Sequence, residues 1–345
     1  MPLYDELKDI TKEKWRYYSD MNFEGYEEAI IKPFEFIKTY FECGNKNEFI
    51  FKSLFYFQQE DNNEQNIRAI HTVNTFFLGI YLKERINFLK PHKNSFLAKE
   101  NNFLWAWFLC SLYHDAFFNN NEDVGVRCDY NRYSNALLYN PDLIKRYYEK
   151  EKNPKSSHND KSNYDHGIIG AEKLYSNYKE MFTYVEKYCS NQTYYGLRID
   201  KTTFKSICQI AKIIACHNVF VAKPKEIEKY KELPELIPEN IGLFHYMPNI
   251  KNRYSMSSYE KLYFLLALVD TLEPTKRGIN LKDIDIDVQD NYDGSYILKI
   301  DLFNELGDYE KYQNGIMEFK DWLNFIEKSE DGKEITINFN HNKNC

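Results

Sequence analysis

Most apolar residues in the first 280 positions of the chain recur at helical spacing. Apolar residues three and four positions apart form one stripe along a helix, and such a stripe packs against other helices. The spacing predicts helices within residues 1–60 and over 64–88, 99–118, 204–217 and 258–272, with a helix start at Pro33. The segment 99–118 is the most hydrophobic of these, and we expect it to be buried.

The pattern changes at about residue 281. Residues 283–288 and 296–302 alternate between apolar and polar around a turn-like segment that contains Gly294. Alternation with period two is typical of β-strands, so these segments predict a β-hairpin. A helix at 309–328 and a strand at 334–339 follow. The predicted fold class is therefore mainly α, a helical bundle with a small C-terminal α+β appendage of ββαβ order.

A polar stretch at 119–164 interrupts the helical segments. It contains three consecutive asparagines from Asn119, and we expect one helix in it, near 141–151, beginning at Pro141. We therefore divide the chain into an N-terminal helical extension at 1–63, a main helical domain at 64–280 with an insertion at about 119–164, and the appendage at 281–345. For the insertion two roles stay open, a lid or wall beside a site and a solvated surface excursion.

The adjacent residues His114 and Asp115 end the apolar run 103–113. An imidazole and a carboxylate side by side offer one nitrogen and up to two oxygens to a divalent cation. Four further ligand-type residues lie within or at the edge of apolar helical segments, namely His71, His166, His217 and Asp270. A single histidine on an apolar helix is more often a hydrogen-bonded core residue. A carboxylate after an apolar run, however, is rarely buried unless it is paired or holds a metal. Together the six residues predict a metal site.

Composition limits the classes of molecule that the protein is expected to bind and indicates where in the cell it is expected to lie. The formal net charge of −7 and the pI near 5.7 argue against extended nucleic acid, whereas a small anionic substrate held by a metal stays compatible. The seven cysteines contain no Cys-x-x-Cys pair, which argues against disulfides and a thiolate zinc site. The N-terminus is acidic and amphipathic, and no apolar stretch reaches the roughly 18 residues of a membrane span. We therefore expect a cytoplasmic protein without a membrane partner.

The order of the six candidate ligands resembles the HD-domain superfamily of metal-dependent phosphohydrolases over about residues 64–280. Two local pieces are similar to the bacterial HD-domain enzymes that split diadenosine tetraphosphate symmetrically. These pieces are His-Gly-Ile-Ile-Gly-Ala at 166–171 and Val-Asp-Thr-Leu-Glu-Pro-Thr-Lys-Arg at 269–277. The resemblance implies an HD-domain helical bundle. Phe118 is a departure, because the family commonly places a phosphate-binding lysine three residues after the aspartate of the His-Asp pair.

The resemblance also implies how the ligands divide between ions. The implied ligands of a first divalent ion are His71, His114, Asp115 and Asp270. His166 and His217 would help to hold a second ion, with Asp115 bridging the two. Imidazole and carboxylate ligands suit iron or manganese, with zinc, nickel and magnesium also open, so the expected cofactor is one or two divalent ions. Asp115 and His166 are expected to take part directly in catalysis.

Three basic residues are candidates for gripping a substrate phosphate. Lys276 and Arg277 lie just past Asp270, where a phosphate clamp and a basic helix C-terminus are both open. Arg68 lies one turn before His71 and is the third candidate. In the same region, Glu273 is expected to orient a ligand histidine.

The predicted function is hydrolysis of a phosphoester or phosphoanhydride bond in a small anionic, nucleotide-type substrate by metal-activated water. One alternative is an HD nuclease or phosphodiesterase acting on single-stranded or cyclic oligonucleotides, which needs a basic aromatic groove. The other is a degenerate HD scaffold in a protein complex. An oligomer or protein partner would bind through 1–63 or 281–345. The acidic balance argues against the nuclease, and the full set of ligands argues against the scaffold.

Overall fold

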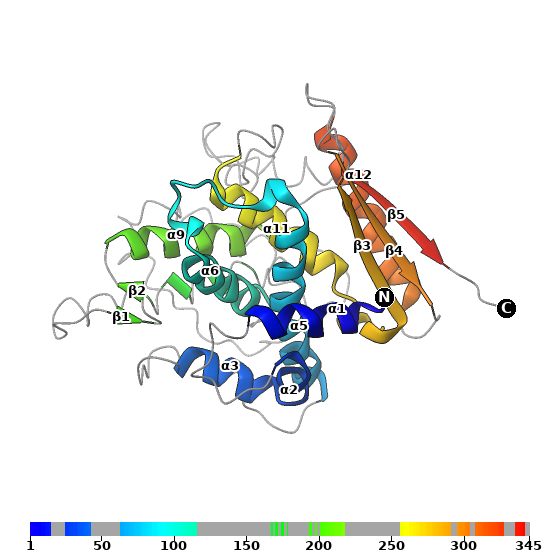
Figure 1. Ribbon diagram of the computed structural model, residues 1–345, viewed down its shortest axis with the longest axis horizontal. Coiled ribbons are helices and arrows are strands. Elements are labelled where there is room, and N and C mark those ends of the chain that lie inside the picture. Colours follow the sequence, from blue (N-terminus) through cyan, green and yellow to red (C-terminus); the bar gives the residue numbers. More distant parts are fainter. Residues whose placement is uncertain are drawn as a thin grey trace, which may run out of the picture.

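The computed structural model describes most of the helical segments and the C-terminal sheet (Figure 1). The described residues are 1–14, 25–42, 63–115, 167, 170, 171, 174, 175, 178, 193–194, 197–198, 201–217, 256–290, 295–303, 308–327 and 335–341. The predicted insertion at 119–164 and the candidate ligand His166 therefore lie outside the described residues. No helix of the described part combines the length and the apolar character that crossing a bilayer requires.

Four long helices form the bundle, as the apolar spacing predicts. They are α5 (Asn63–Arg85), α6 (Glu100–Tyr113), α9 (Lys201–Cys216) and α11 (Ser258–Leu272). Helix α11 begins at a capping box, in which the Ser257 side chain accepts from the Glu260 backbone and the Glu260 side chain accepts from the Ser257 backbone. Helix α5 contacts both α6 and α11, and α9 contacts α6 and α11, so the four helices enclose one core.

Helix α6 lies at the centre of this arrangement. Every residue from Asn102 to Tyr113 is buried, which is the outcome expected for a helix that is apolar on all sides. Trp107 fixes its contact with α5, since the indole nitrogen donates to the Phe76 carbonyl over 2.8 Å. A Cβ atom at Gly79 would lie 2.0 Å from the Trp107 ring, so this close approach requires glycine. The predicted helix 99–118 is too long, because α6 ends at Tyr113 and the His-Asp pair forms a turn.

Three N-terminal helices pack on α5. They are α1 (Leu3–Lys14), α2 (Tyr26–Ile31) and α3 (Pro33–Glu42), and α3 begins at the proline that the sequence predicts. Leu3 and Leu7 of α1 are fully buried, and α1 also contacts the first strand of the C-terminal sheet. The buried apolar residues from Leu3 to Ile337 form one continuous cluster. The N-terminal extension and the appendage therefore share a core with the bundle.

The C-terminal appendage has the predicted ββαβ order. It consists of β3 (Ile284–Asp290), β4 (Tyr296–Leu302), α12 (Tyr309–Glu327) and β5 (Ile335–His341). Strand β4 is central, antiparallel to β3 and parallel to β5. Helix α12 makes the crossover and contacts both β5 and α11, so the appendage lies beside the C-terminal end of α11 (Figure 1). Two antiparallel strands of two residues each, β1 (Thr193–Tyr194) and β2 (Leu197–Arg198), precede α9 and were not predicted from the sequence.

Candidate metal centre

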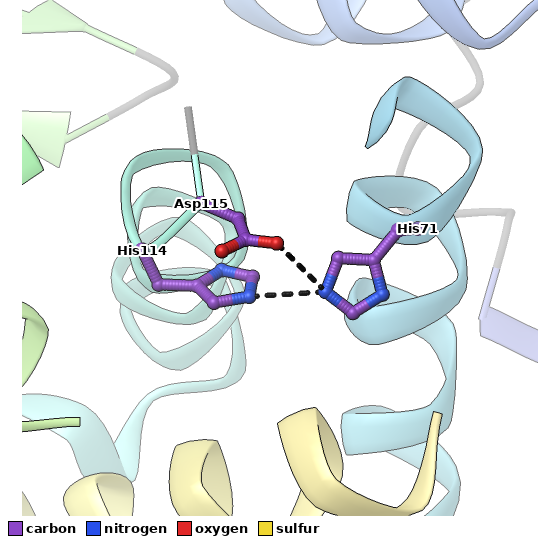
Figure 2. Close-up of side chains that lie close together, drawn as sticks. All are labelled: His71, His114 and Asp115. Atoms are coloured by element: carbon purple, nitrogen blue, oxygen red, sulfur yellow. Dashed lines mark hydrogen bonds and ion pairs between the residues drawn. The ribbon is translucent and has the colours of Figure 1, made fainter. Parts of the chain in front are cut away.

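Three helices bring four of the six predicted ligands together. His71 comes from α5, His114 and Asp115 come from the turn after α6, and Asp270 comes from the last turn of α11. The His71 Nε2 atom lies 3.2 Å from His114 Nε2, and Figure 2 shows these nitrogens and the Asp115 carboxylate converging. The four residues are at most 8% exposed. Buried polar side chains require hydrogen-bond or ion-pair partners, and these partners determine which atoms of the four side chains carry protons.

Glu273 fixes the ring of His71. The His71 Nδ1 atom lies 2.6 Å from Glu273 Oε2, and the Glu273 side chain is fully buried. Burial alone would raise the pKa of Glu273, but the His71 imidazole and the hydrogen bonds from Thr275 lower the pKa below its ordinary value of 4.5. An ionised carboxylate can only accept, so Nδ1 of His71 carries a proton. Glu273 therefore contacts His71 as expected, and its role as the partner of a metal ligand stays a prediction.

A backbone carbonyl fixes the ring of His114, as Glu273 fixes the ring of His71. Its Nδ1 atom lies 2.9 Å from the Ser111 carbonyl oxygen, which can only accept. In a neutral His114 ring, Nε2 is therefore the atom with a free lone pair, and it faces His71 Nε2. Two lone pairs facing each other over 3.2 Å repel, so a proton or a cation must lie between the nitrogens.

The carboxylate of Asp270 completes this meeting point. Its Oδ1 atom lies 3.4 Å from His71 Nε2 and 3.4 Å from His114 Nε2. Burial would raise the pKa of Asp270, but the Lys276 ammonium and the two imidazoles hold the pKa well below 3.8. Asp115 Oδ2 lies 3.6 Å from His71 Nε2. The centre thus combines two imidazole nitrogens with two carboxylates.

The carboxylates around His71 change the pKa of its imidazole. Burial and the Lys276 ammonium both lower its pKa, whereas the carboxylates of Glu273 and Asp270 raise it. The carboxylates prevail, and the pKa of His71 lies above its ordinary value of 6.5. A site that stabilises an extra proton between buried carboxylates and imidazoles also has the charge and the donors for a divalent cation, which competes with that proton.

Two of the three predicted phosphate-gripping residues lie at the centre. Arg68 donates from Nη1 to Asp115, and Lys276 donates from Nζ to Asp270. Their side chains are 18% and 17% exposed, so both cations lie partly in solvent while they pair with buried carboxylates. Each cation therefore pairs with a carboxylate of the centre and is also accessible from solvent.

Arg277, the third predicted phosphate-gripping residue, is not brought to the centre. Its guanidinium lies over the Tyr312 ring of α12, 5.7 Å from the ring centroid, and its Nη1 atom donates to the Glu273 carbonyl. Its Nη2 atom lies 3.2 Å from the position that a Cβ at Gly315 would occupy. Arg277 thus connects the end of α11 to the appendage, although Lys276 beside it faces the carboxylates.

His217 lies next to the centre, at the end of α9. Its Nδ1 atom lies 2.7 Å from the Ile214 carbonyl, which leaves Nε2 as the ligand-type nitrogen of the neutral ring. The ring centroids of His217 and His114 lie 5.3 Å apart. A Cβ at Gly167 would lie 2.7 Å from His217 Nδ1, and one at Gly170 would lie 2.0 Å from the Tyr113 carbonyl oxygen. Glycine at these two positions therefore leaves room for the His217 ring and for the Tyr113 carbonyl.

Within the described part of the chain, His71, His114 and Asp115 form a buried group that could hold a metal ion, with their ligand atoms within 4.8 Å of one another. Sequence reasoning missed Asn74, which donates to Glu273 Oε1 over 3.1 Å. Asn74 lies three residues after His71 on α5, so helical spacing places it on the same face and could have indicated it. Comparison with protein-family models, with curated proteins and with solved structures found no match.

Proposed function

We propose that the centre binds a divalent metal through His71, His114, Asp115 and Asp270, and that the protein is a phosphohydrolase of the HD-domain type. One observation carries this proposal. The Nδ1 atoms of His71 and His114 are each held by an acceptor, and their Nε2 atoms meet at 3.2 Å beside buried carboxylates. In this arrangement both Nε2 lone pairs are left to one shared proton or cation, and a divalent cation competes with that proton.

The donor set is compatible with iron, manganese, zinc, nickel or magnesium, with iron and manganese preferred by mixed imidazole and carboxylate ligation. Such an ion supplies a water that is activated near neutral pH and neutralises charge on a phosphoryl group. Glu273 holds His71 in the tautomer that offers Nε2, and the Ser111 carbonyl does the same for His114. Asp115 is the proposed bridging and catalytic carboxylate.

A second ion is proposed beside the first, with His217 and His166 as ligands. The proximity of the His217 and His114 rings supports His217. His166 is proposed from the sequence alone. Replacing His217 with Ala is expected to reduce the metal content from about two ions to about one. If the metal content stays unchanged while activity falls, His217 contacts substrate or transfers a proton instead.

The proposed substrate is a small phosphate ester or anhydride of the nucleotide type. Arg68 and Lys276 support this choice. Both cations are partly exposed beside the carboxylates, and both can donate charge-assisted hydrogen bonds to phosphate oxygens. They also offer a substitute for the lysine that the HD family places where this chain has Phe118. Lys276 and Arg68 are therefore the proposed phosphate-binding residues.

The decisive experiment is metal analysis coupled to a substrate screen. We expect protein purified without oxygen to contain about one or two divalent ions per chain. Nucleotides, dinucleoside polyphosphates, cyclic dinucleotides and single-stranded oligonucleotides are then tested for hydrolysis. Cleavage of small nucleotides supports the proposal, and cleavage of oligonucleotides alone would assign a nuclease. A folded protein that binds none of the five metals would be a scaffold, and the proposal would be wrong.

A further inference from the structure

A chain of buried hydrogen bonds joins the N-terminal helix α2 to the candidate centre. The hydroxyl of Tyr26, the first residue of α2, donates to Asn74 Oδ1 over 2.7 Å. Asn74 Nδ2 donates to Glu273 Oε1 over 3.1 Å, and the other oxygen of Glu273 lies 2.6 Å from His71 Nδ1. The four side chains come from α2, α5 and the end of α11, and each is at most 1% exposed.

The direction of each hydrogen bond follows from the donor inventory. The carboxylate of Glu273 can only accept, so the side of Asn74 that faces Glu273 must be its amide nitrogen. The Asn74 oxygen then points toward Tyr26, and the Tyr26 hydroxyl has one proton to give it. Asn74 Nδ2 also reaches Thr275 Oγ1 over 3.2 Å. Every polar atom along this path therefore has a partner, which selects one arrangement of the network.

The Tyr26 hydroxyl is itself held in place by packing. The ring of Tyr26 makes edge-on contacts with Phe77 of α5 and Tyr4 of α1, with centroid distances of 5.2 Å and 5.8 Å. Removal of the hydroxyl alone therefore leaves the ring in its packed position. It also leaves the Asn74 oxygen buried without its donor, which loosens the amide that steadies Glu273.

We propose that Tyr26 and Asn74 are positioning residues of the centre, through which the N-terminal helix α2 fixes the Glu273 carboxylate and thereby the ring of His71. The proposal rests on the proposed function, in that the ring is positioned to offer Nε2 to a metal. It assigns the N-terminal extension a part in the site, although none of the six proposed ligands lies in the extension. Partners of ligand histidines typically change metal affinity about 10- to 100-fold when they are lost.

The test compares Tyr26→Phe with Tyr81→Phe. Tyr81 is a matched control, because it is 1% exposed, lies on α5, and donates its hydroxyl to the Ile286 carbonyl over 2.7 Å on the appendage side. Each variant loses one buried hydroxyl with one hydrogen bond, so both should lose similar thermal stability. We expect only Tyr26→Phe to weaken Mn²⁺ binding, by about tenfold. Asn74→Leu, which removes the direct donor to Glu273, should weaken it further.

A second measurement does not depend on metal. Nitrogen NMR of the chelator-treated, histidine-labelled protein reports which ring nitrogen of His71 carries the proton, with the signal assigned through His71→Gln. We expect Nδ1 of His71 to carry a proton in the wild type and in Tyr81→Phe, and a shifted His71 signal in Tyr26→Phe. A wild-type signal in Tyr26→Phe overturns the proposal, as does an equal shift in both variants.

The two measurements separate the inference from the proposed function. If the wild type binds none of the candidate metals, the proposed function fails, and the His71 signals alone decide whether Tyr26 positions the ring. If the wild type binds Mn²⁺ and Tyr26→Phe binds it equally well, the metal site stands and the positioning role of Tyr26 is wrong.

Discussion

The bundle and the C-terminal sheet each contain several carboxylates that lie close together, but the two groups differ in burial and in the residues that contact them. In the bundle, Asp115, Asp270 and Glu273 are 4%, 8% and 0% exposed. A cation or an imidazole contacts each of these three carboxylates. Burial makes an unpaired carboxylate costly, so these partners stabilise the folded state.

In the sheet, the carboxylates lie on the face that is turned toward solvent. Asp285 and Asp301 are directly opposite each other in β3 and β4, and Asp287 lies two residues further along β3. Asp287 is exposed, and Asp285 and Asp301 are half-buried. Cations lie beside these carboxylates as well, since the Met1 ammonium pairs with Asp285 over 2.9 Å and Lys299 lies opposite Asp287 in the sheet. The difference between the two regions is that only in the bundle do the carboxylates lie buried beside imidazole nitrogens, whereas exposed acidic groups are common without a metal ion.

The largest expected effect contrasts the two regions directly. His114→Ala and Asp115→Ala should each abolish metal binding and hydrolysis, because each removes a ligand from the buried group. Asp287→Ala, which removes a carboxylate from the sheet, should leave both properties unchanged. Metal content, hydrolysis of the best nucleotide and far-ultraviolet circular dichroism are measured on all three variants. Full activity in His114→Ala or Asp115→Ala, with the helical signal retained, would show that the bundle is not the site.

The next effect concerns the charge that holds His71. Glu273→Gln preserves the shape of the side chain but removes the carboxylate that accepts from His71 Nδ1. We expect metal affinity to fall about 10- to 100-fold, as it does when the carboxylate partner of a ligand histidine is lost. Competition with a fluorescent chelator measures the change. An unchanged affinity would mean that Ser111, Asp270 and the packing of α5 suffice to orient the ligands.

The same pair predicts how stability depends on pH in chelator-treated protein. The pKa of Glu273 is lowered, so its contribution is present above about pH 4.5 and is lost as the pH falls through the folded-state pKa. The pKa of His71 is raised, so its contribution is present below about pH 6.5 and is lost as the pH rises through its folded-state pKa. Urea unfolding should show a flatter profile at both ends in Glu273→Gln. Identical profiles in the two proteins would contradict the coupling of this pair.

Much of the fold and of the centre could be predicted from the sequence, because strong periodicity and a few buried ligand-type residues constrain both. The strand β4 was predicted at 296–302 and is observed there, since its alternating burial leaves one register. The meeting of His71, His114, Asp115 and Asp270 followed from their places on apolar helices. These residues indicate a site because a polar side chain in an apolar helix is costly to bury unless it is paired or binds a metal.

What could not be predicted depends on contacts between distant segments or on the direction of a side chain. Tyr26 and Asn74 are 48 residues apart, and nothing in either segment indicates that a hydroxyl from one meets an amide from the other. Lys276 and Arg277 are adjacent in a 3₁₀ turn, where successive side chains point in different directions. Sequence therefore gives both the same role, whereas the structure directs one to the bundle and the other to the appendage.

Lys276 and Arg277 offer the sharpest comparison between the regions. Lys276→Ala should raise the KM for a nucleotide about 10- to 100-fold, because a charge-assisted hydrogen bond to phosphate is worth roughly 1.5–3 kcal/mol. The KM for a small aryl phosphate, which lacks the non-transferred phosphate, should change far less. Metal content is measured in parallel, since Lys276 also contacts Asp270. Equal effects on both substrates would place Lys276 at the transferred phosphoryl group or at the fold.

The smallest effect is expected at Arg277, on the appendage side. Arg277→Met keeps the apolar stem but removes the guanidinium that lies over Tyr312 and donates to the Glu273 carbonyl. A cation over an aromatic ring contributes about 0.5–2 kcal/mol, so the free energy of unfolding should fall by about 1 kcal/mol. The KM values for the nucleotide and the aryl phosphate should both match the wild type, because the guanidinium faces α12 and not the centre. Urea unfolding and steady-state kinetics measure the two quantities on one preparation. A raised KM for the nucleotide alone, with unchanged stability, would restore Arg277 to the phosphate clamp and contradict its assignment to the appendage.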